Sequence, residues 1–290
     1  MPSHALERLY SAFPHLHRDG LNARWSHATN SADALKAALS SADVDLVECD
    51  LVHRHVSSWW WWWPWAAATT DEAMMGHDLK DACKNFSFAQ FVEQWNSSVG
   101  SAGKGLKLDF KTLAAAEAAI ELLNGTEQGQ KLLGQLPVLF LNADVVGCPQ
   151  RPTPTVDGKR FLETAARLDV KNDTRCFILL SLGWVTKASP SFQYTAEMVD
   201  EMSALAALSS RDVTFAVRTG FFGESKHQLL RLLRQEPDRY SITLWHAKWD
   251  TVTQDGYLNP LMELRKQVPK SQVLYDLPDH VVDSLKDKQQ

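Results

Sequence analysis

The sequence has few cysteines, no long apolar run and no strong excess of one charge, and each absence argues against a class of protein. A membrane-spanning helix needs about 20 consecutive apolar residues, and the 290-residue sequence contains no such run. Residues 1–19 lack the apolar core of a secretory signal peptide, which predicts a cytoplasmic location. The four cysteines are far apart and form no C-x-x-C pair, which argues against a thiolate zinc site and a dense disulfide scaffold.

The charge balance argues against nucleic-acid binding. The formal net charge is −5 and charged residues make up 22% of the chain, so nothing predicts the broad basic surface that holds a phosphate backbone. The hydrophobic content of 44% is close to that of an ordinary globular domain. We therefore expect a globular protein without a nucleic-acid partner.

What is present is a repeated alternation of short apolar runs with helix-like segments. Parallel strands need such helical crossovers, and no G-x-G-x-x-G turn follows the first run, as an open nucleotide-binding sheet would require. The pattern predicts an α/β fold, a single (β/α)8 TIM barrel over residues 1–290 with its core at about 23–264. The eight expected strands are Ala23–His27, Val44–Asp50, Ala73–His77, Gly105–Lys111, Pro137–Asn142, Cys176–Trp184, Asp212–Arg218 and Ser241–Lys248.

Polar and titratable side chains gather at the C-terminal ends of these runs. This is the end at which TIM barrels carry their active sites, so we predict the functional site at this rim. The residues concerned are His27, Glu48, Asp50, His77, Asp78, Asp109, Lys111, Asn142, Asp144, Trp184, Arg218, Trp245 and His246.

Two of the expected strands predict a metal site. Glu48 and Asp50 are two residues apart on the second strand, and Asp109 lies between Lys107 and Lys111 at the same spacing on the fourth. Side chains at i and i+2 share one face of a strand, so three carboxylates converge if those faces point into the barrel mouth. Mg²⁺ or Ca²⁺ would relieve their mutual repulsion. The alternative is a structural network in which the two lysines neutralise the carboxylates.

Two histidines are predicted to flank the carboxylates. His27 ends the first expected strand and His77 ends the third, on either side of the strand that carries Glu48. Imidazole groups titrate near neutrality, so the pair suits a general base and a general acid. Lys111 would balance the negative charge that develops on a phosphoryl group. Taken singly, each histidine could equally be a loop residue that its neighbours satisfy.

Five further rim residues are candidates for substrate binding. Asn142, like Asp144 on the same strand face, could support the metal ligands or bind a substrate hydroxyl. Arg218 could bind a phosphate in bidentate fashion, although a structural pair with a carboxylate is the alternative for Arg218. Tryptophans could wall the pocket, although core packing is their commoner role. The five candidates are Lys107, Asn142, Trp184, Arg218 and Trp245.

The ordered set of His27, Glu48-x-Asp50, His77-Asp78 and Asp109-x-Lys111 resembles the phospholipase C-like phosphodiesterase superfamily and its glycerophosphodiester phosphodiesterase branch. A closer resemblance is to the menorin family, whose members are barrels of this superfamily. The similar segments are Trp25–Ser31, Val44–Asp50, Gly105–Lys111, Leu141–Asp144, Ser181–Thr186, Val213–Arg218 and Leu244–Trp245.

The resemblance implies a TIM barrel in which His27 and His77 act as acid and base. It also implies Mg²⁺ or Ca²⁺ on the three carboxylates and cleavage of a P–O bond. His27 is followed by Ala28, where glycerophosphodiester enzymes usually have Arg-Gly. Menorins are known chiefly through a component of an adhesion complex, which implies a binding role as the alternative.

A tryptophan run interrupts the chain between the second and third expected strands. Trp59–Trp65 holds six tryptophans within an expected insert loop at 56–72. One interpretation is contact with a membrane interface, where tryptophan is preferred. A second is a cover over the pocket, and a third is a low-complexity insertion that packs on the barrel surface or is partly disordered.

Together these features predict a metal-dependent, phosphodiesterase-like hydrolase or lyase. Its substrate would be a phosphodiester or phospholipid-like small molecule, of the lipid head-group or glycerophosphodiester type. The main alternative is a catalytically silent barrel that binds a protein or a lipid. A third interpretation is a sugar hydrolase that uses Glu48 and Asp109 as a carboxylate pair.

Overall fold

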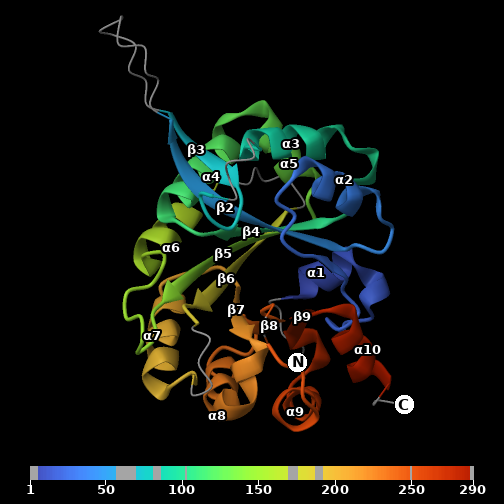
Figure 1. Cartoon of the computed structure of the whole chain (residues 1–290), viewed down its shortest axis with the longest axis vertical. Helices are drawn as coiled ribbons and strands as arrows, with labels where there is room; N and C mark the ends of the chain where they lie inside the picture. The colour runs from blue at the N-terminus through green and yellow to red at the C-terminus, as the bar shows by residue number, and fades with distance from the viewer. Residues whose placement is uncertain are drawn as a thin grey trace, which may run out of the picture.

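Eight parallel strands form a nearly closed barrel with helices around its outside (Figure 1). The computed structural model describes residues 6–56, 70–80, 86–101, 103–168, 176–186, 192–248 and 250–287. The order around the barrel is β1-β2-β4-β5-β6-β7-β8-β9, and β3 pairs with β2 outside this path. The strands are β1 (Trp25–Ser26), β2 (Leu46–Val56), β3 (Thr70–Met75), β4 (Gly105–Phe110), β5 (Val138–Val146), β6 (Phe177–Trp184), β7 (Val213–Arg218), β8 (Tyr240–Trp245) and β9 (Val273–Asp276).

The helices begin at capping residues that the sequence supplies. α2 starts after Ser31, whose hydroxyl accepts a hydrogen bond from the Ala34 N–H at 3.2 Å, as expected of a helix N-cap. The helices are α1 (Glu7–Ala12), α2 (Ala32–Ser40), α3 (Phe88–Ser97), α4 (Leu113–Gly125), α5 (Glu127–Gln135), α6 (Gly158–Ala166), α7 (Ala196–Ala206), α8 (Phe222–Leu233), α9 (Asn259–Gln267) and α10 (Asp279–Asp287).

β3 corrects the prediction for Ala73–His77, which is not a barrel strand. β3 runs antiparallel to the outer part of β2, from the pair Leu51↔Met75 to the pair Val56↔Thr70. The barrel neighbour of β2 is therefore β4, and the eighth barrel strand is β9, beyond the core expected at 23–264. A short apolar run indicates that a strand forms but not which strand it pairs with, so the expected set of eight included one wrong member and omitted β9.

Apolar side chains fill one end of the barrel interior. Leu46, Phe140, Leu179 and Leu274 form a buried cluster there, and Leu9 of α1 joins it. The residues between them along the strands face outward and pack under the helices in a second, larger cluster. The carboxylates of the interior lie toward the opposite end, where the strands end.

The barrel closes between β9 and the chain that precedes β1. Gly20 forms a parallel bridge with Leu274, and a Cβ at Gly20 would lie 2.1 Å from the Val273 carbonyl oxygen, so the approach requires glycine. Beside this bridge the Arg265 guanidinium donates to both carboxylate oxygens of Asp19, at 2.9 and 2.6 Å. A backbone bridge and an ion pair thus hold this seam of the barrel.

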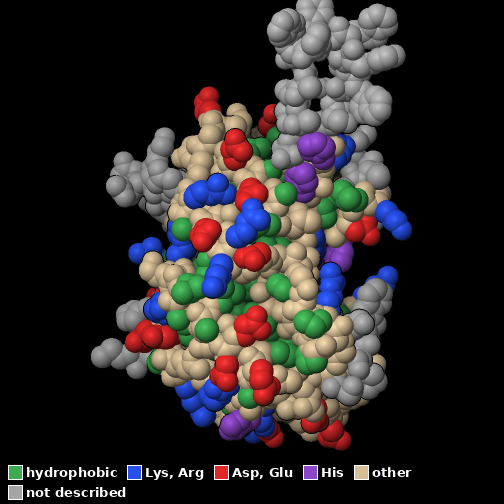
Figure 2. Space-filling model, turned by 90° about the vertical axis from the view of Figure 1, so that its left-hand side faces the viewer, with side chains coloured by type: hydrophobic (Ala, Val, Ile, Leu, Met, Phe, Trp, Pro, Cys, Tyr) green, Lys and Arg blue, Asp and Glu red, His purple; other side chains and the backbone are tan. Residues whose placement is uncertain are grey.

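The outer surface carries mixed charge. Figure 2 shows Lys and Arg side chains interspersed with Asp and Glu over one face of the protein, and this face lacks a broad basic area. None of the helices in the described ranges combines the length and the apolar character needed to cross a bilayer. The predicted membrane contact through Trp59–Trp65 lies outside the described residues.

Candidate functional site

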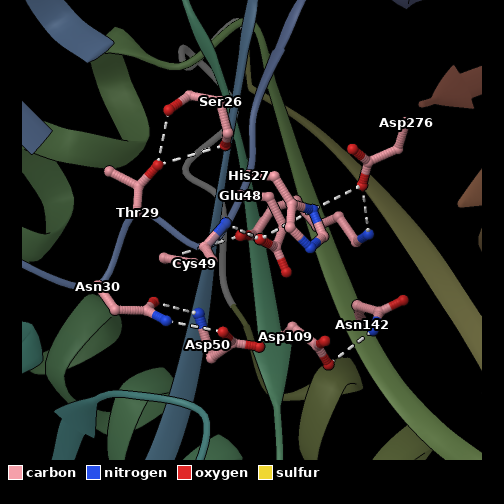
Figure 3. Close-up of polar contacts among 12 residues, drawn as sticks. Ser26, His27, Thr29, Asn30, Glu48, Cys49, Asp50, Asp109, Asn142 and Asp276 are labelled. Carbon is pink, nitrogen blue, oxygen red and sulfur yellow. Dashed lines mark hydrogen bonds and ion pairs between the residues drawn. The ribbon is translucent and has the colours of Figure 1, made fainter. Parts of the chain in front are cut away.

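Strand alternation turns the three predicted carboxylates into the barrel. Glu48 and Asp50 are 2% and 4% exposed on β2, while Cys49 between them faces the outer apolar cluster. Asp109 of β4 is the register partner of Asp50. One oxygen from each of the three carboxylates lies within 4.8 Å of the others, and Figure 3 shows them converging. The structure therefore brings together the three residues predicted as metal ligands.

Asn30 holds Asp50 from the loop between β1 and α2. The Asn30 Nδ2 donates to Asp50 Oδ2 at 2.7 Å, and the Asp50 backbone N–H donates to Asn30 Oδ1 at 2.8 Å (Figure 3). Because Ser31 caps α2, the Asn30 side chain is left to make this reciprocal pair. Asn30 was not among the predicted site residues, so its role in orienting Asp50 was missed.

Asp109 is held in a similar way from β5 and β6. Asn142 Nδ2 donates to Asp109 Oδ1 at 2.7 Å, and the Ser181 hydroxyl donates to Asn142 Oδ1 at 2.6 Å. Asn142 thus orients a carboxylate, which is the supporting role predicted beside substrate binding. Oriented carboxylates with hydrogen-bonded partners are typical of metal sites in proteins.

Lys111 joins the two aspartates. Its Nζ lies 2.7 Å from Asp50 Oδ1 and 2.6 Å from Asp109 Oδ2. Burial opposes the charge on Lys111, but the two carboxylates outweigh it and raise its pKa. In return Lys111 lowers the pKa of Asp109 against the effect of burial. Both Lys111 and Asp109 are therefore charged at neutral pH.

Glu48 lies against the loop that follows β1. The Ala28 backbone N–H donates to Glu48 Oε2 at 2.6 Å, and Ala28 adopts a left-handed conformation with φ of 52°. This conformation is rare for a residue with a Cβ, so the loop accepts local strain to aim its N–H at the carboxylate. Burial raises the pKa of Glu48 to about 7, although the neighbouring His27 charge opposes the shift.

His27 is placed between Glu48 and an aspartate from the last strand. Its Nδ1 lies 3.5 Å from Glu48 Oε2 and 3.3 Å from Asp276 Oδ2 (Figure 3). The Glu48 carboxylate raises the pKa of His27 to about 9, against the effect of burial. With Nδ1 next to Asp276, Nε2 is the ring nitrogen left to exchange a proton with a ligand.

Asp276 is the functional candidate that the sequence analysis missed. It is 5% exposed, and Lys107 Nζ lies 3.5 Å from the Asp276 oxygen that faces His27. Burial acts to raise the pKa of Asp276, but His27 and Lys107 outweigh it and lower the pKa. The signal for it was available, because Val273–Asp276 is an apolar run ending in a carboxylate, like the runs that were recognised.

His77 is placed differently from the prediction. It follows β3 in the hairpin and is exposed, so it does not end a barrel strand beside β2. The hairpin ties it to the site only through the preceding residue, since the Gly76 N–H donates to the Asp50 backbone carbonyl at 2.9 Å. In the described part of the chain, the His77 ring makes no hydrogen bond or ion pair with the acidic cluster.

Two of the five predicted substrate-binding residues have structural partners instead. Trp184 is 1% exposed, and its indole N–H donates to the Met198 carbonyl of α7, so it packs in the outer core. Arg218 pairs with Asp250, with Nη2 donating to Oδ1 at 2.5 Å and Nε donating to Oδ1 at 2.9 Å and to Oδ2 at 3.2 Å. These placements match the core-packing and ion-pair alternatives.

The remaining substrate-binding candidates stay close to the rim. Trp245 is partly exposed, is the register partner of Asp276 and lies beside Arg218, whose Cζ is 5.9 Å from its ring centroid. Lys107 is buried under the Trp25 ring, 5.6 Å from its centroid, and pairs with Asp276. Lys107 therefore supports His27 through Asp276 rather than facing a ligand directly.

Asp144 adds a fourth carboxylate on β5. It lies next to Gly183 of β6, where a Cβ would come within 2.4 Å of Asp144 Oδ1. Burial raises the pKa of Asp144 to about 7, and Asp109 adds to the shift. The Asp144 carboxylate therefore occupies the space that a side chain at residue 183 would take.

Comparisons with known proteins give the family. The human protein named Protein FAM151B is 30% identical over 262 residues, which cover 89% of this chain and 83% of that protein. Among solved structures, a phosphonopyruvate hydrolase complexed with oxalate and Mg²⁺ matches with a TM-score of 0.47 at 10% identity, over 100% of this chain and 85% of that one. A 2,3-dimethylmalate lyase matches with a TM-score of 0.44 at 10% identity, over 100% of this chain and 84% of that one. The family profile described as the menorin N-terminal domain matches residues 19–282. Because this match covers most of the chain, the protein belongs to the menorin family, as the resemblance of its segments predicted.

Proposed function

We propose that the protein is a metal-dependent, phosphodiesterase-like hydrolase or lyase. The observation that carries the proposal is the convergence of two buried carboxylates, Glu48 and Asp50, and the partly buried Asp109 beside a histidine that an aspartate holds. Glu48, Asp50 and Asp109 would hold the metal, and His27 with Asp276 would move protons. The order of His27, Glu48, Asp50 and Asp109 along the chain resembles that of the phospholipase C-like superfamily, and this resemblance favours a phosphodiester as substrate.

The carboxylates fit a divalent cation with oxygen ligands. Ligand oxygens at 2.3–2.6 Å from Ca²⁺ lie up to about 5 Å apart across the ion, and those of Mg²⁺ up to about 4 Å apart. The oxygens of Glu48, Asp50 and Asp109 lie within 4.8 Å of one another, which is inside the span of Ca²⁺ ligands, whereas Mg²⁺ would need them within about 4 Å. The ion would polarise a phosphoryl oxygen.

The histidines would carry out the proton transfers. An oxygen from water or from a neighbouring substrate hydroxyl attacks phosphorus while the P–O bond to the leaving oxygen breaks. One histidine takes the proton of the attacking oxygen, and the other gives a proton to the leaving oxygen. Because Glu48 raises the pKa of His27 to about 9, His27 holds a proton at neutral pH, which suits the acid. His77, on the exposed segment tied to β2 through Gly76, would be the base.

The substrate would be a phosphodiester of the lipid head-group or glycerophosphodiester type. Lys111, already 2.6–2.7 Å from two carboxylates, would balance the charge on the phosphoryl oxygens. The loop after His27 offers Ala28 and Thr29, with no arginine to grip a glycerol phosphate. This composition favours a lipid head-group over a small glycerophosphodiester.

Metal binding is tested by thermal unfolding after treatment with a chelator. A ligand that binds only the folded state at 100 times its Kd adds about 2.7 kcal/mol to the free energy of unfolding. Mg²⁺ or Ca²⁺ at millimolar concentration should therefore raise the Tm of the wild type, and Glu48→Gln should remove most of the rise. Glu121→Gln, an exposed change on α4, is the matched control. A Tm that neither ion moves would contradict the ligand assignment.

Turnover is tested on a panel of lysophospholipids, glycerophosphodiesters and cyclic nucleotides with added Mg²⁺. We expect His27→Ala and His77→Ala each to lower kcat by about 10²–10⁴-fold, the usual contribution of a general acid or base. Loss on His27→Ala without loss on His77→Ala would assign the second proton transfer to another group.

A catalytically silent barrel is the second candidate, and the ion pairs of Lys111 favour it. These pairs neutralise Asp50 and Asp109 within the chain, as the structural-network alternative predicted. This candidate expects no turnover with any phosphodiester and no rise of Tm with either ion. It also expects partner or lipid binding that survives the double change of His27 and His77 to alanine.

A further inference from the structure

Lys111 contacts one oxygen of each of the two aspartates in the proposed metal site. Its ammonium contacts Asp50 Oδ1 at 2.7 Å and Asp109 Oδ2 at 2.6 Å. The other oxygen of each aspartate is also engaged, by the Asn30 amide at 2.7 Å and the Asn142 amide at 2.7 Å. Every oxygen of the two aspartates therefore already has a donor from the chain.

The donors differ in what an arriving cation would do to them. An amide N–H carries no net charge and leaves a lone pair on the oxygen free for a metal. The ammonium of Lys111 is a full positive charge, and its side chain is 22% exposed, so a cation on the same oxygens repels it at close range. Asn30 and Asn142 can stay in place, whereas Lys111 must withdraw from at least one aspartate.

We propose that Lys111 competes with the divalent ion for Asp50 and Asp109. Its ammonium keeps the affinity for the metal low until another charge draws it away from these carboxylates. This inference rests on the proposed metal site of Glu48, Asp50 and Asp109 and concerns its regulation. The lysine fills the role of a cation in the ion-free protein, which stabilises the acidic cluster. The same contact raises the Kd of the metal, because the ion must displace the ammonium from at least one aspartate.

The test is a calorimetric titration of Mg²⁺ and of Ca²⁺ into chelator-treated protein, without any substrate. Lys111→Met should bind at least one ion about tenfold more tightly than the wild type, which corresponds to about 1.4 kcal/mol. Lys226→Met is the matched control, because Lys226 pairs with Glu263 on the outer surface, and its Kd should equal that of the wild type. Lys111→Gln serves as a second variant if Lys111→Met does not fold in chelator, since it keeps a neutral donor between the aspartates.

The outcomes separate this inference from the metal site itself. Equal or weaker binding by Lys111→Met and Lys111→Gln, with binding by the wild type, overturns the competitor and leaves the metal site standing. Binding by the Lys111 variants alone supports the competitor. Absence of binding by the wild type and by both variants overturns the competitor together with the proposed metal site.

Discussion

Removal of the Asn30 side chain offers a direct test of how the loop after β1 supports the acidic cluster. Asn30→Ala deletes two contacts with Asp50, a charge-assisted bond of 2.7 Å and a bond of 2.8 Å from the Asp50 backbone N–H. A hydrogen bond to a charged group contributes about 1.5–3 kcal/mol and a neutral one about 0.5–1.5 kcal/mol. Lys111 still contacts the other Asp50 oxygen, so the lower half of the summed range applies. We expect the free energy of unfolding to fall by about 2–3 kcal/mol.

Urea denaturation followed by tryptophan fluorescence measures this loss. Asn124→Ala is the control, because the Asn124 amide donates to the Arg167 carbonyl at an exposed position on α4. This change should lower the free energy of unfolding by only about 0.5 kcal/mol, the low end of the range for a neutral hydrogen bond. If Asn30→Ala unfolds at the same urea concentration as Asn124→Ala, the paired contacts with Asp50 do not support the cluster as described.

Three further changes test other features of the site. Ala28→Gly removes a Cβ from a left-handed residue with φ of 52°. We expect the free energy of unfolding to stay the same or to rise by up to about 1 kcal/mol. A clear fall in the urea midpoint would contradict the presence of strain at this residue. Gly183→Ala places a Cβ 2.4 Å from Asp144 Oδ1 and should lower the free energy of unfolding by about 1–3 kcal/mol. Adding Asp144→Ala should recover most of this stability. Burial raises the pKa of Asp144 from 3.8 to about 7, so the folded protein keeps a proton that the unfolded chain releases, and its stability falls as pH rises from about 4 to 7. In the presence of chelator, Asp144→Asn should reduce this dependence of stability on pH. If the dependence is unchanged, it arises from other groups such as Glu48 and not from Asp144.

The parts of the site that follow from strand geometry could be predicted from the sequence. A strand has a period of two, so Glu48 and Asp50 had to share a face, as did Lys107, Asp109 and Lys111. The apolar residues between them fixed which face was buried under helices. Convergence of the carboxylates followed once the strands were arranged as parallel neighbours.

The parts that depend on pairing between distant segments could not be predicted in the same way. The run around Ala73 has the composition of a barrel strand, but hydrogen bonding to the outer half of β2 makes it a hairpin partner. Asp276 acquires its role only because β9 closes the barrel beside β1. Trp184 lies on the outer face of β6 with Leu182, whereas Leu179 points into the barrel. Because successive residues of a strand face opposite sides, an assignment shifted by one residue places Trp184 inside.

The seam of the barrel has a consequence for how the protein responds to heat. His27 follows β1 on one side of the seam and Asp276 ends β9 on the other, and β1 itself is only two residues long. Fluctuations that loosen the Gly20–Leu274 bridge would separate this histidine from its aspartate while the remaining strands stay paired. Warming should therefore uncouple the two side chains well below the temperature at which the barrel as a whole melts.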